Sequence, residues 1–264
     1  MASLDGSTSA PPAFSAAAAH LARSPRTAVV WGVLLRDALA TYGRPADSDH
    51  HLLDVVDVGG GTGGFAVPLA EAGHRVTVVD PSPDALASLL RRAGETGAVV
   101  HAVQGDAAGL LDVVAPGSAD LVLCHGVLEH VDEVRPAVES LVAVLRPGGT
   151  LSVLVAHRNA AVVARTVAGH YAEARHALAD PDGRWGPGDP LPRRFTEAGL
   201  LAVLGATGLE VGSVHGVRTL ADLAPATDAD ADPAEELVEL ELATAGLPEF
   251  RAVATQLHVL ASRV

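Results

Sequence analysis

Short apolar runs alternate with stretches of helical spacing through the middle of the chain. Four runs rich in Val, Leu and Ala are predicted to be strands because each is brief and ends in Gly, Pro or a polar residue. These runs cover residues 52–58, 74–79, 99–103 and 119–124. Between the fourth run and a fifth at 150–155, apolar residues recur from Val134 to Leu145 at the spacing of an amphipathic helix. Alternating strands and helices predict an α/β fold.

The same patterns predict further elements at both ends of the chain. Residues 1–15 are small, polar and broken by proline, so we expect a disordered tail. We expect residues 16–264 to form one domain, with N-terminal helices within 16–42, at about 16–21 and at 25–42, and insertions at about 159–195 and 219–250. Further predicted helices cover 159–178, 196–207 and 233–245, and further strands cover 209–217 and 255–262. Residues 180–192 contain four prolines and three glycines, which predicts a surface loop or lid.

Composition is consistent with a single packed domain. With 264 residues, of which 48% are hydrophobic, the chain can bury a full core. The single cysteine, Cys124, excludes an intrachain disulfide and lies in a predicted strand, where we expect it to be apolar filler. No apolar run reaches the length of a membrane span, so we expect a cytoplasmic protein.

Charge narrows the choice of partners. The formal net charge is −14, and all 18 basic residues are arginine. This balance argues against broad nucleic-acid binding, which depends on clustered positive charge, but it leaves room for one local arginine cluster.

A glycine-rich turn follows the first predicted strand. Asp57 ends an apolar run, and Gly59, Gly60 and Gly61 come directly after it. We expect the next helix to begin near Thr62, and glycines at such a junction between a strand and a helix let a ligand approach the backbone N–H groups closely. Such a turn fits a dinucleotide, a phosphate or an adenosyl group, and a tight turn without a ligand is the alternative.

Two acids follow the next two predicted strands. Asp80 ends the second strand, where a carboxylate can accept hydrogen bonds from two ribose hydroxyls, as it does in NAD enzymes. Gly105 and Asp106 follow the third strand, and Asp106 can reach an adenine amino group. The set therefore fits an adenosine-containing cofactor.

The ordered set of motifs resembles the class I S-adenosylmethionine-dependent methyltransferases. The matching pieces lie within residues 50–156 and include Asp57-Val-Gly-Gly-Gly-Thr-Gly63, Asp80, Gly105-Asp106, the strand from Asp120 to His125, and Leu145-Arg-Pro-Gly-Gly149. The Leu-Arg-Pro-Gly-Gly segment at 145–149 is not expected in a dehydrogenase. The resemblance implies S-adenosylmethionine as cofactor. It also implies a Rossmann-like, seven-stranded, mostly parallel sheet with an antiparallel last strand and helices on both faces.

Segments outside this core resemble the bacterial tRNA 5-carboxymethoxyuridine methyltransferases, which esterify a carboxylate on a wobble uridine. These segments begin at Pro25-Arg26, Val167-Ala-Gly, His215-Gly-Val-Arg and Leu257-His-Val. The resemblance implies that Arg26 contacts the carboxylate of the cofactor. It also implies that Gly59, Gly60, Asp80, Gly105 and His125 line the cofactor site, to which we add Asp57, Gly61 and Asp106.

The chain departs from that family in its substrate-facing parts. The family's lysine-rich stretch is replaced by an acidic, proline-rich segment at 179–190, its aromatic–Asn pair by Ala156-His157, and its Tyr-bearing segment before the first long helix is missing. The methyl acceptor is therefore either tRNA or a small-molecule metabolite. For an anionic acceptor, Arg158, Arg165 and Arg218 are the candidate anchoring cations.

Other functional classes stay open at this point. A non-catalytic protein that binds S-adenosylmethionine or scaffolds a partner is one alternative, and an NAD oxidoreductase is a more distant one. No metal is expected, because His125, Glu129 and His130 lack the spacing of a zinc protease. The sequence carries no indication of oligomeric state.

Overall fold

The computed structural model describes residues 27–39, 52–224 and 233–264. Arg26, the predicted helix at 16–21 and the predicted tail at 1–15 lie outside these ranges. Of the helix predicted at 25–42, the described part begins at Ala28 and continues as a π-helical segment from Leu34 to Leu39.

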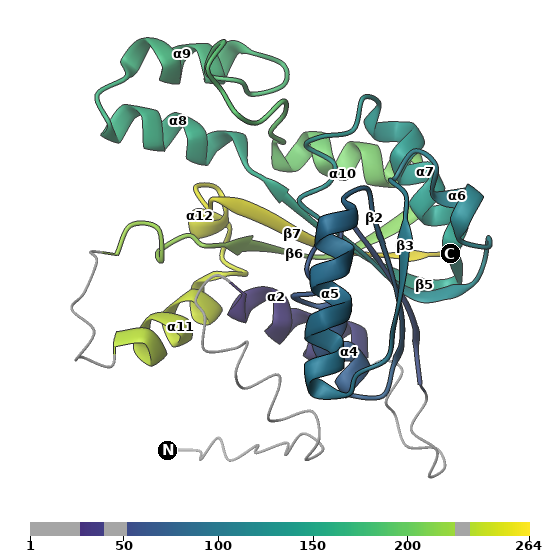
Figure 1. Cartoon of the computed structure of the whole chain (residues 1–264). Helices are drawn as coiled ribbons and strands as arrows, with labels where there is room; N and C mark the ends of the chain where they lie inside the picture. Colours follow the sequence, from purple (N-terminus) through teal and green to yellow (C-terminus); the bar gives the residue numbers. More distant parts are fainter. Residues whose placement is uncertain (1–26, 40–51, 225–232) are drawn as a thin grey trace.

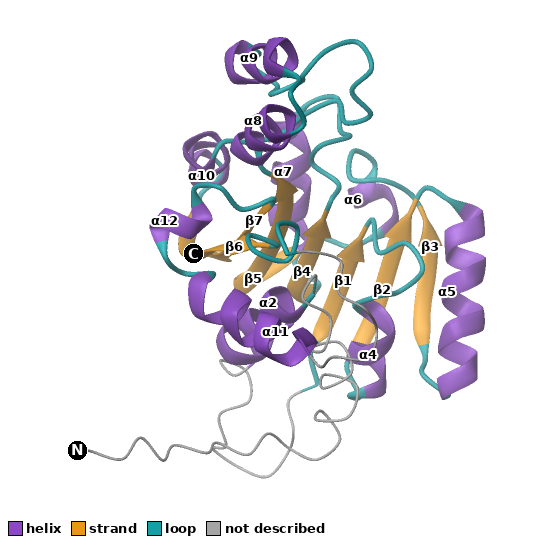
Figure 2. Cartoon of the chain, turned by 90° about the vertical axis from the view of Figure 1, so that its left-hand side faces the viewer, coloured by secondary structure: helices purple, strands orange, loops and turns teal. Residues whose placement is uncertain are grey.

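One seven-stranded sheet organises the fold, in the order β3-β2-β1-β4-β5-β7-β6 (Figures 1 and 2). Neighbouring strands pair in parallel except β7, which is antiparallel to both β5 and β6. The predicted fold class, with its antiparallel last strand, is therefore confirmed. The strands are β1 (Asp54–Val58), β2 (Arg75–Asp80), β3 (Val100–Gln104), β4 (Ala119–His125), β5 (Leu145–Ala156), β6 (Leu209–Val217) and β7 (Gln256–Arg263).

Helices cover both faces of the sheet. The described helical segments are α2 (Ala28–Val33), η1 (Leu34–Leu39), α4 (Ala66–Glu71), α5 (Pro83–Thr96), α6 (Leu110–Val113), α7 (Val134–Val144), α8 (Arg158–Val167), α9 (Tyr171–Ala179), α10 (Glu197–Ala206), α11 (Pro233–Thr244) and α12 (Pro248–Arg251). In Figure 2, α8 and α9 stand beyond the carboxyl ends of the central strands. None of these described helices is long and apolar enough to cross a membrane.

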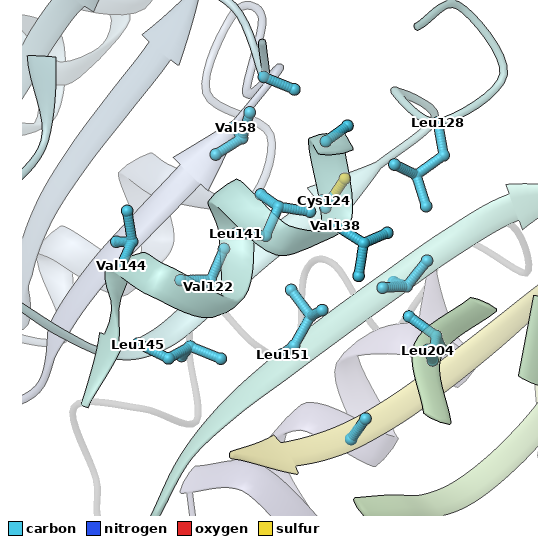
Figure 3. Packing of buried hydrophobic residues seen from close by; sticks show 14 of the residues in the cluster. Val58, Val122, Cys124, Leu128, Val138, Leu141, Val144, Leu145, Leu151 and Leu204 are labelled. Carbon is cyan, nitrogen blue, oxygen red and sulfur yellow. The ribbon is translucent and has the colours of Figure 1, made fainter. Parts of the chain in front are cut away.

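Alternating strand residues divide the core into two layers. On one face, Val122 and Cys124 of β4 pack with α7 and α10, and Figure 3 shows this layer from close by. On the other face, Leu121 and Leu123 pack with α2, α4 and α5. Cys124 is fully buried and burial raises the pKa of its thiol, so it is the apolar filler expected from its strand position.

The helix predicted over 159–178 is wrong, because the structure divides it into α8 and α9. Gly169 adopts a left-handed conformation with φ +79 and ends α8. The N–H of Gly169 donates to the carbonyl of Thr166 (3.0 Å), and that of His170 donates to Arg165 (2.8 Å). This is the Schellman pattern of a helix end, and it gives the insertion a corner between its two helices.

Two predicted boundaries also move. The helix after the glycine turn begins at Ala66 rather than near Thr62, because residues 60–65 are used by the turn. Strand β5 begins at Leu145 rather than Thr150, with an irregular register opposite β4 before Leu121.

Candidate active site

The carboxyl edge of the sheet brings together most of the residues that the sequence singles out. Strands β3, β2, β1 and β4 lie side by side and run in the same direction, so the segments that follow them meet at one edge. These segments carry Asp106, Asp80, the glycine turn and His125, in that spatial order. Arg26 lies outside the described residues, and its role stays a prediction.

The glycine turn has a geometry that side chains would disrupt. The N–H of Gly59 donates to the carbonyl of Val79 (2.7 Å), which ties the turn to the end of β2. Gly59 has φ +73, and a Cβ there would lie 2.3 Å from Val127; a Cβ on Gly60 would lie 2.6 Å from the Asp57 carboxylate. Gly61 has φ +54, and its Cβ position meets no side chain within 4 Å. The turn is therefore packed against the protein on one side and bare on the other.

Asp80 is held beside this turn by two backbone groups. Its Oδ2 accepts from the N–H of Gly61 (2.9 Å) and its Oδ1 from the N–H of Ser82 (2.9 Å). A carboxylate has about four lone-pair sites, so each oxygen keeps capacity for a ligand hydroxyl. The side chain is thus oriented by the fold before any ligand binds.

Asp57 supports the turn from beneath. It is 3% exposed, and burial together with the nearby charge of Asp80 raises the pKa of its carboxyl to about 7. Its carboxyl group lies against Gly60, so its part in the site is to shape the turn.

Gly105 and Asp106 form the next corner of the edge. The N–H of Gly105 donates to the carbonyl of Asp80 (3.2 Å). Asp106 is exposed, and its Oδ1 accepts from the N–H groups of Ala108 (3.0 Å) and Gly109 (2.8 Å). Its carboxylate is therefore fixed by its own turn at the β3 end of the edge.

His125, at the end of β4, belongs to a row of histidines on the α2 face of the sheet. Its Nε2 shares a hydrogen bond with Ser152 Oγ (2.8 Å), which also bonds His258 Nε2 (2.8 Å). Its ring stands edge-on to Phe65, just past the glycine turn, with the centroids 4.8 Å apart. His215 lies opposite His258 in the sheet register. The imidazole of His125 is thus held by Ser152 and Phe65 on the α2 face of the sheet, next to the carboxyl edge.

These histidines predict a loss of stability in acid. Burial lowers the pKa of His125 to about 3 and the pKa of His258 well below its ordinary value. Both stay neutral in the folded protein while the unfolded chain binds protons below about pH 6.5. The stability that each contributes is therefore complete above pH 6.5 and is lost as the pH falls toward the folded pKa, by up to about 1.4 kcal/mol per pH unit. Asp57 acts in the opposite sense below pH 7 and offsets one histidine.

Urea unfolding between pH 7.5 and 4.5 tests this expectation. Below pH 6 the free energy of unfolding should fall less steeply for His258→Gln than for the unmodified protein, by about 1.4 kcal/mol per pH unit. His101→Gln, on the exposed side of β3, controls for the loss of a histidine. Equal slopes in the unmodified protein and His258→Gln would contradict a neutral, buried His258.

Glu129 is a further acid at this edge, and the sequence patterns predict no role for it in the site. It is 3% exposed, and its Oε1 accepts from the N–H of Ala156 (2.6 Å), so it joins the segment after β4 to the end of β5. Its other oxygen is buried without a hydrogen-bond partner, and burial raises the pKa of its carboxyl. The sequence signal that could have indicated a buried role for Glu129 is its position directly after the apolar residues Val127 and Leu128.

The three candidate anchoring arginines differ in their surroundings. Arg165 pairs with Glu173 (3.2 Å) and lies over the ring of Trp185 (4.0 Å to the centroid). Arg218 pairs with Asp222 (2.8 Å). Arg158, the first residue of α8, has no ion pair among the described residues, and its Nε is buried without a hydrogen bond.

A hollow of about 710 Å³ lies elsewhere, at the amino ends of β1 and β2, and is lined by Asp54, His74 and Arg75. The glycine turn and Asp80 do not line this hollow. The candidate cofactor site is therefore at the carboxyl edge, where these groups lie, and not in the hollow. No group of three or more His, Cys, Asp or Glu residues within the described ranges is arranged to hold a metal.

The edge fits an adenosine-containing cofactor in an extended pose. Asp80 has free acceptor capacity for ribose hydroxyls, Asp106 lies two residues beyond the end of β3, and no side chain lies within 4 Å of the Cβ position of Gly61. A ligand bound by Asp80 at this edge would have to cross the end of β1 to reach His125. Together with the seven-stranded sheet and its antiparallel last strand, this arrangement defines a class I S-adenosylmethionine-dependent methyltransferase.

Comparisons with known proteins identify the family. A family model for a methyltransferase domain matches residues 56–153. The chain is 30% identical over 244 residues to a tRNA 5-carboxymethoxyuridine methyltransferase of Escherichia coli O157:H7, covering 90% of this chain and 88% of that protein. It belongs to the sequence family of these methyltransferases.

Other relatives share less of the chain or only its fold. A ubiquinone biosynthesis O-methyltransferase of Methylocella silvestris is 36% identical over 106 residues, which is 38% of each protein. The structure of magnesium protoporphyrin IX methyltransferase from Synechocystis PCC 6803 with bound SAH has a TM-score of 0.56 and 17% identity, covering 91% of this chain and 82% of that one. The protein is an enzyme that uses S-adenosylmethionine.

Proposed function

We propose that the protein methylates a carboxylate on a modified wobble uridine of tRNA. The observation that carries this proposal is the extent of the similarity to the tRNA methyltransferase, which covers 90% of the chain. The similarity to the ubiquinone methyltransferase covers only 38% of it. An alignment of that length includes most of the chain after β5, of which α8 and α9 stand beyond the carboxyl ends of the central strands (Figure 2).

Local charge supports an anionic acceptor. Residues 158–194 contain six arginines and only four acidic residues, within a chain whose net charge is −14. Three of these arginines, Arg165, Arg193 and Arg194, are engaged by Glu173, Asp182 and Asp189. Arg158, Arg175 and Arg184 have no ion pair among the described residues. The insertion is therefore the part of the described chain suited to approach RNA phosphates.

A carboxylate acceptor suits what the site contains. Bound S-adenosylmethionine supplies an electrophilic methyl group on a sulfonium. A carboxylate is already ionised at neutral pH and needs no general base, which agrees with the low pKa and enclosed nitrogens of His125. Alignment of the reactants is then the main contribution of the chain, worth roughly 7–11 kcal/mol in favourable cases. Asp80 and the glycine turn provide the fixed side of that alignment.

The test is a methylation assay with defined acceptors. Purified protein and S-adenosylmethionine are incubated with tRNA that carries carboxymethoxyuridine at the wobble position, with the same tRNA carrying plain uridine, and with a small catechol. We expect methyl transfer only to the first, as an ester that mild alkali removes. An alkali-stable methyl group on the tRNA, or transfer only to the catechol, would contradict the proposal and favour a different acceptor.

A second prediction concerns tRNA affinity. Arg175 and Arg184 are exposed on the insertion, so Arg175→Ala/Arg184→Ala should weaken tRNA binding and lower its salt dependence by about two phosphate contacts. Arg91→Ala/Arg92→Ala, on α5 at the other side of the sheet, removes the same charge as a control (Figure 2). Binding isotherms at two salt concentrations measure both effects. An equal loss in the two double variants would mean that only net charge matters.

A further inference from the structure

Arg158 stands apart from the neighbouring arginines of the insertion. Within the described residues, Arg165, Arg193 and Arg194 each have an acidic partner, whereas Arg158, like the exposed Arg175 and Arg184, has none. In that part of the chain it is also the one arginine with a buried guanidinium nitrogen that lacks a hydrogen bond. A cation with a buried, unpaired N–H is unfavourable unless an anion completes its hydrogen bonds.

The side chain of Arg158 is held in place along its length. A Cβ on Gly183 would lie 2.8 Å from Cγ and 3.1 Å from Cδ of Arg158, so the aliphatic stem packs directly against the Gly183 backbone. The N–H of Arg158 donates to the carbonyl of Phe195 (2.9 Å), and the N–H of Arg194 donates to Asp182 (2.7 Å). The loop that contains Gly183 is thus closed over this arginine, and the guanidinium is positioned before a ligand arrives.

This position is connected to the carboxyl edge of the sheet that carries the candidate cofactor site. Arg158 lies two residues after the end of β5, which Glu129 ties to the segment after β4. Arg193 Nη1 donates to the carbonyl of Val131 (2.9 Å), so the loop over Arg158 is tied to the same segment. That segment follows His125, which is the last residue of β4 and one of the residues expected to line the cofactor site.

The local electrostatics also favour an anion. Helix α8 has no acidic residue in its first turn, and His157 at its N-cap makes no side-chain hydrogen bond to it. The positive end of the helix dipole therefore adds to the charge of Arg158 rather than being neutralised. A cation at this end of a helix is unfavourable alone and favourable with a bound carboxylate.

We propose that Arg158 is the specificity-determining residue that binds the carboxylate of the acceptor nucleotide. This inference rests on the proposed function. The planar guanidinium of Arg158 can bind a carboxylate through two parallel hydrogen bonds, which a lysine cannot reproduce. The residue thereby distinguishes a carboxymethoxy-bearing uridine from one without the acid, and leaves phosphate contacts to exposed arginines.

The experiment compares two synthetic anticodon stem-loops, one with carboxymethoxyuridine and one with uridine at the wobble position. Binding to the protein loaded with S-adenosylhomocysteine is measured for the unmodified protein, Arg158→Ala and Arg158→Lys. The unmodified protein should prefer the acid-bearing RNA. Arg158→Ala should weaken binding of that RNA about 10- to 100-fold and leave the uridine RNA unchanged, with Arg158→Lys in between.

A second pair of variants displaces the arginine without removing its charge. Gly183→Ala places a methyl group against the Arg158 stem at φ +66, whereas Gly169→Ala imposes a similar backbone strain at φ +79 with no atom within 4 Å. Only Gly183→Ala should reduce the preference for the acid-bearing RNA. Equal weakening of both RNAs in Arg158→Ala, or an unchanged preference, would overturn the inference while leaving the proposed function intact. No preference in the unmodified protein would contradict the proposed function itself.

Discussion

Replacing Glu241 by alanine is expected to destabilise the protein by about 3–5 kcal/mol. Glu241 lies on α11 and is fully buried, and its carboxylate receives three consecutive backbone N–H groups. Oε1 accepts from Leu220 (2.7 Å) and Ala221 (2.6 Å), and Oε2 from Thr219 (3.2 Å). Alanine would leave these donors without an acceptor next to a cavity. Consecutive N–H groups around one anion form a nest, so the segment after β6 is ordered largely by this one side chain.

Urea unfolding with matched variants separates this effect from a change in helix charge. Glu239→Ala removes the same charge from an exposed position of α11 and should change the free energy of unfolding by less than about 0.5 kcal/mol. Glu241→Gln keeps one acceptor oxygen and should fall between the two. A loss below 1 kcal/mol in Glu241→Ala would mean that Thr219, Leu220 and Ala221 find other partners easily.

The strands were predictable from sequence because their burial pattern is strong. Strand β6 has the predicted bounds, and β1 to β4 differ from prediction by at most two residues at either end. Runs of Val and Leu that are buried on both faces of a sheet leave few alternatives. Glycine at a turn and an acid at a strand end are similarly local signals, which is why the parts of the cofactor edge were visible in the sequence.

Interactions between distant segments were not predictable in the same way. Arg146 was visible only as part of a turn, yet its guanidinium contacts both Asp54 and Asp120 (2.6 Å each) and joins three strands at the opposite edge of the sheet. Arg165 and Arg218 pair with acids only eight and four residues further along the chain, but sequence spacing alone does not show that these pairs form. Gly169 is a sequence signal for the end of a helix, but the favourable apolar spacing on both sides of it predicted one continuous helix. The pairing of charges in the folded structure therefore decides which candidate residues remain available to a ligand.

Replacing Asp80 by alanine should weaken binding of S-adenosylhomocysteine by about 1–3 kcal/mol, or roughly 5- to 150-fold. Two effects act together. The variant loses the acceptor for ribose hydroxyls, and it also releases the N–H groups of Gly61 and Ser82 that now fix the glycine turn and the start of α5. The structure therefore places the expected loss toward the upper end of that range.

Calorimetric titration with S-adenosylhomocysteine distinguishes these contributions from a general effect of charge. Asp84→Ala removes an acid four residues away, from an exposed position in the first turn of α5, and should leave the affinity unchanged. Asp80→Asn keeps one oxygen, which can serve either the Gly61 N–H or the Ser82 N–H but not both in the present geometry, so its affinity should lie between those of Asp80→Ala and the unmodified protein. An unchanged affinity in Asp80→Ala would mean that the ribose lies elsewhere and would move the cofactor away from the β1–β2 edge. A loss in Asp80→Ala with full affinity in Asp80→Asn would instead show that one hydrogen bond to the turn, rather than the pair to ribose, carries the binding energy.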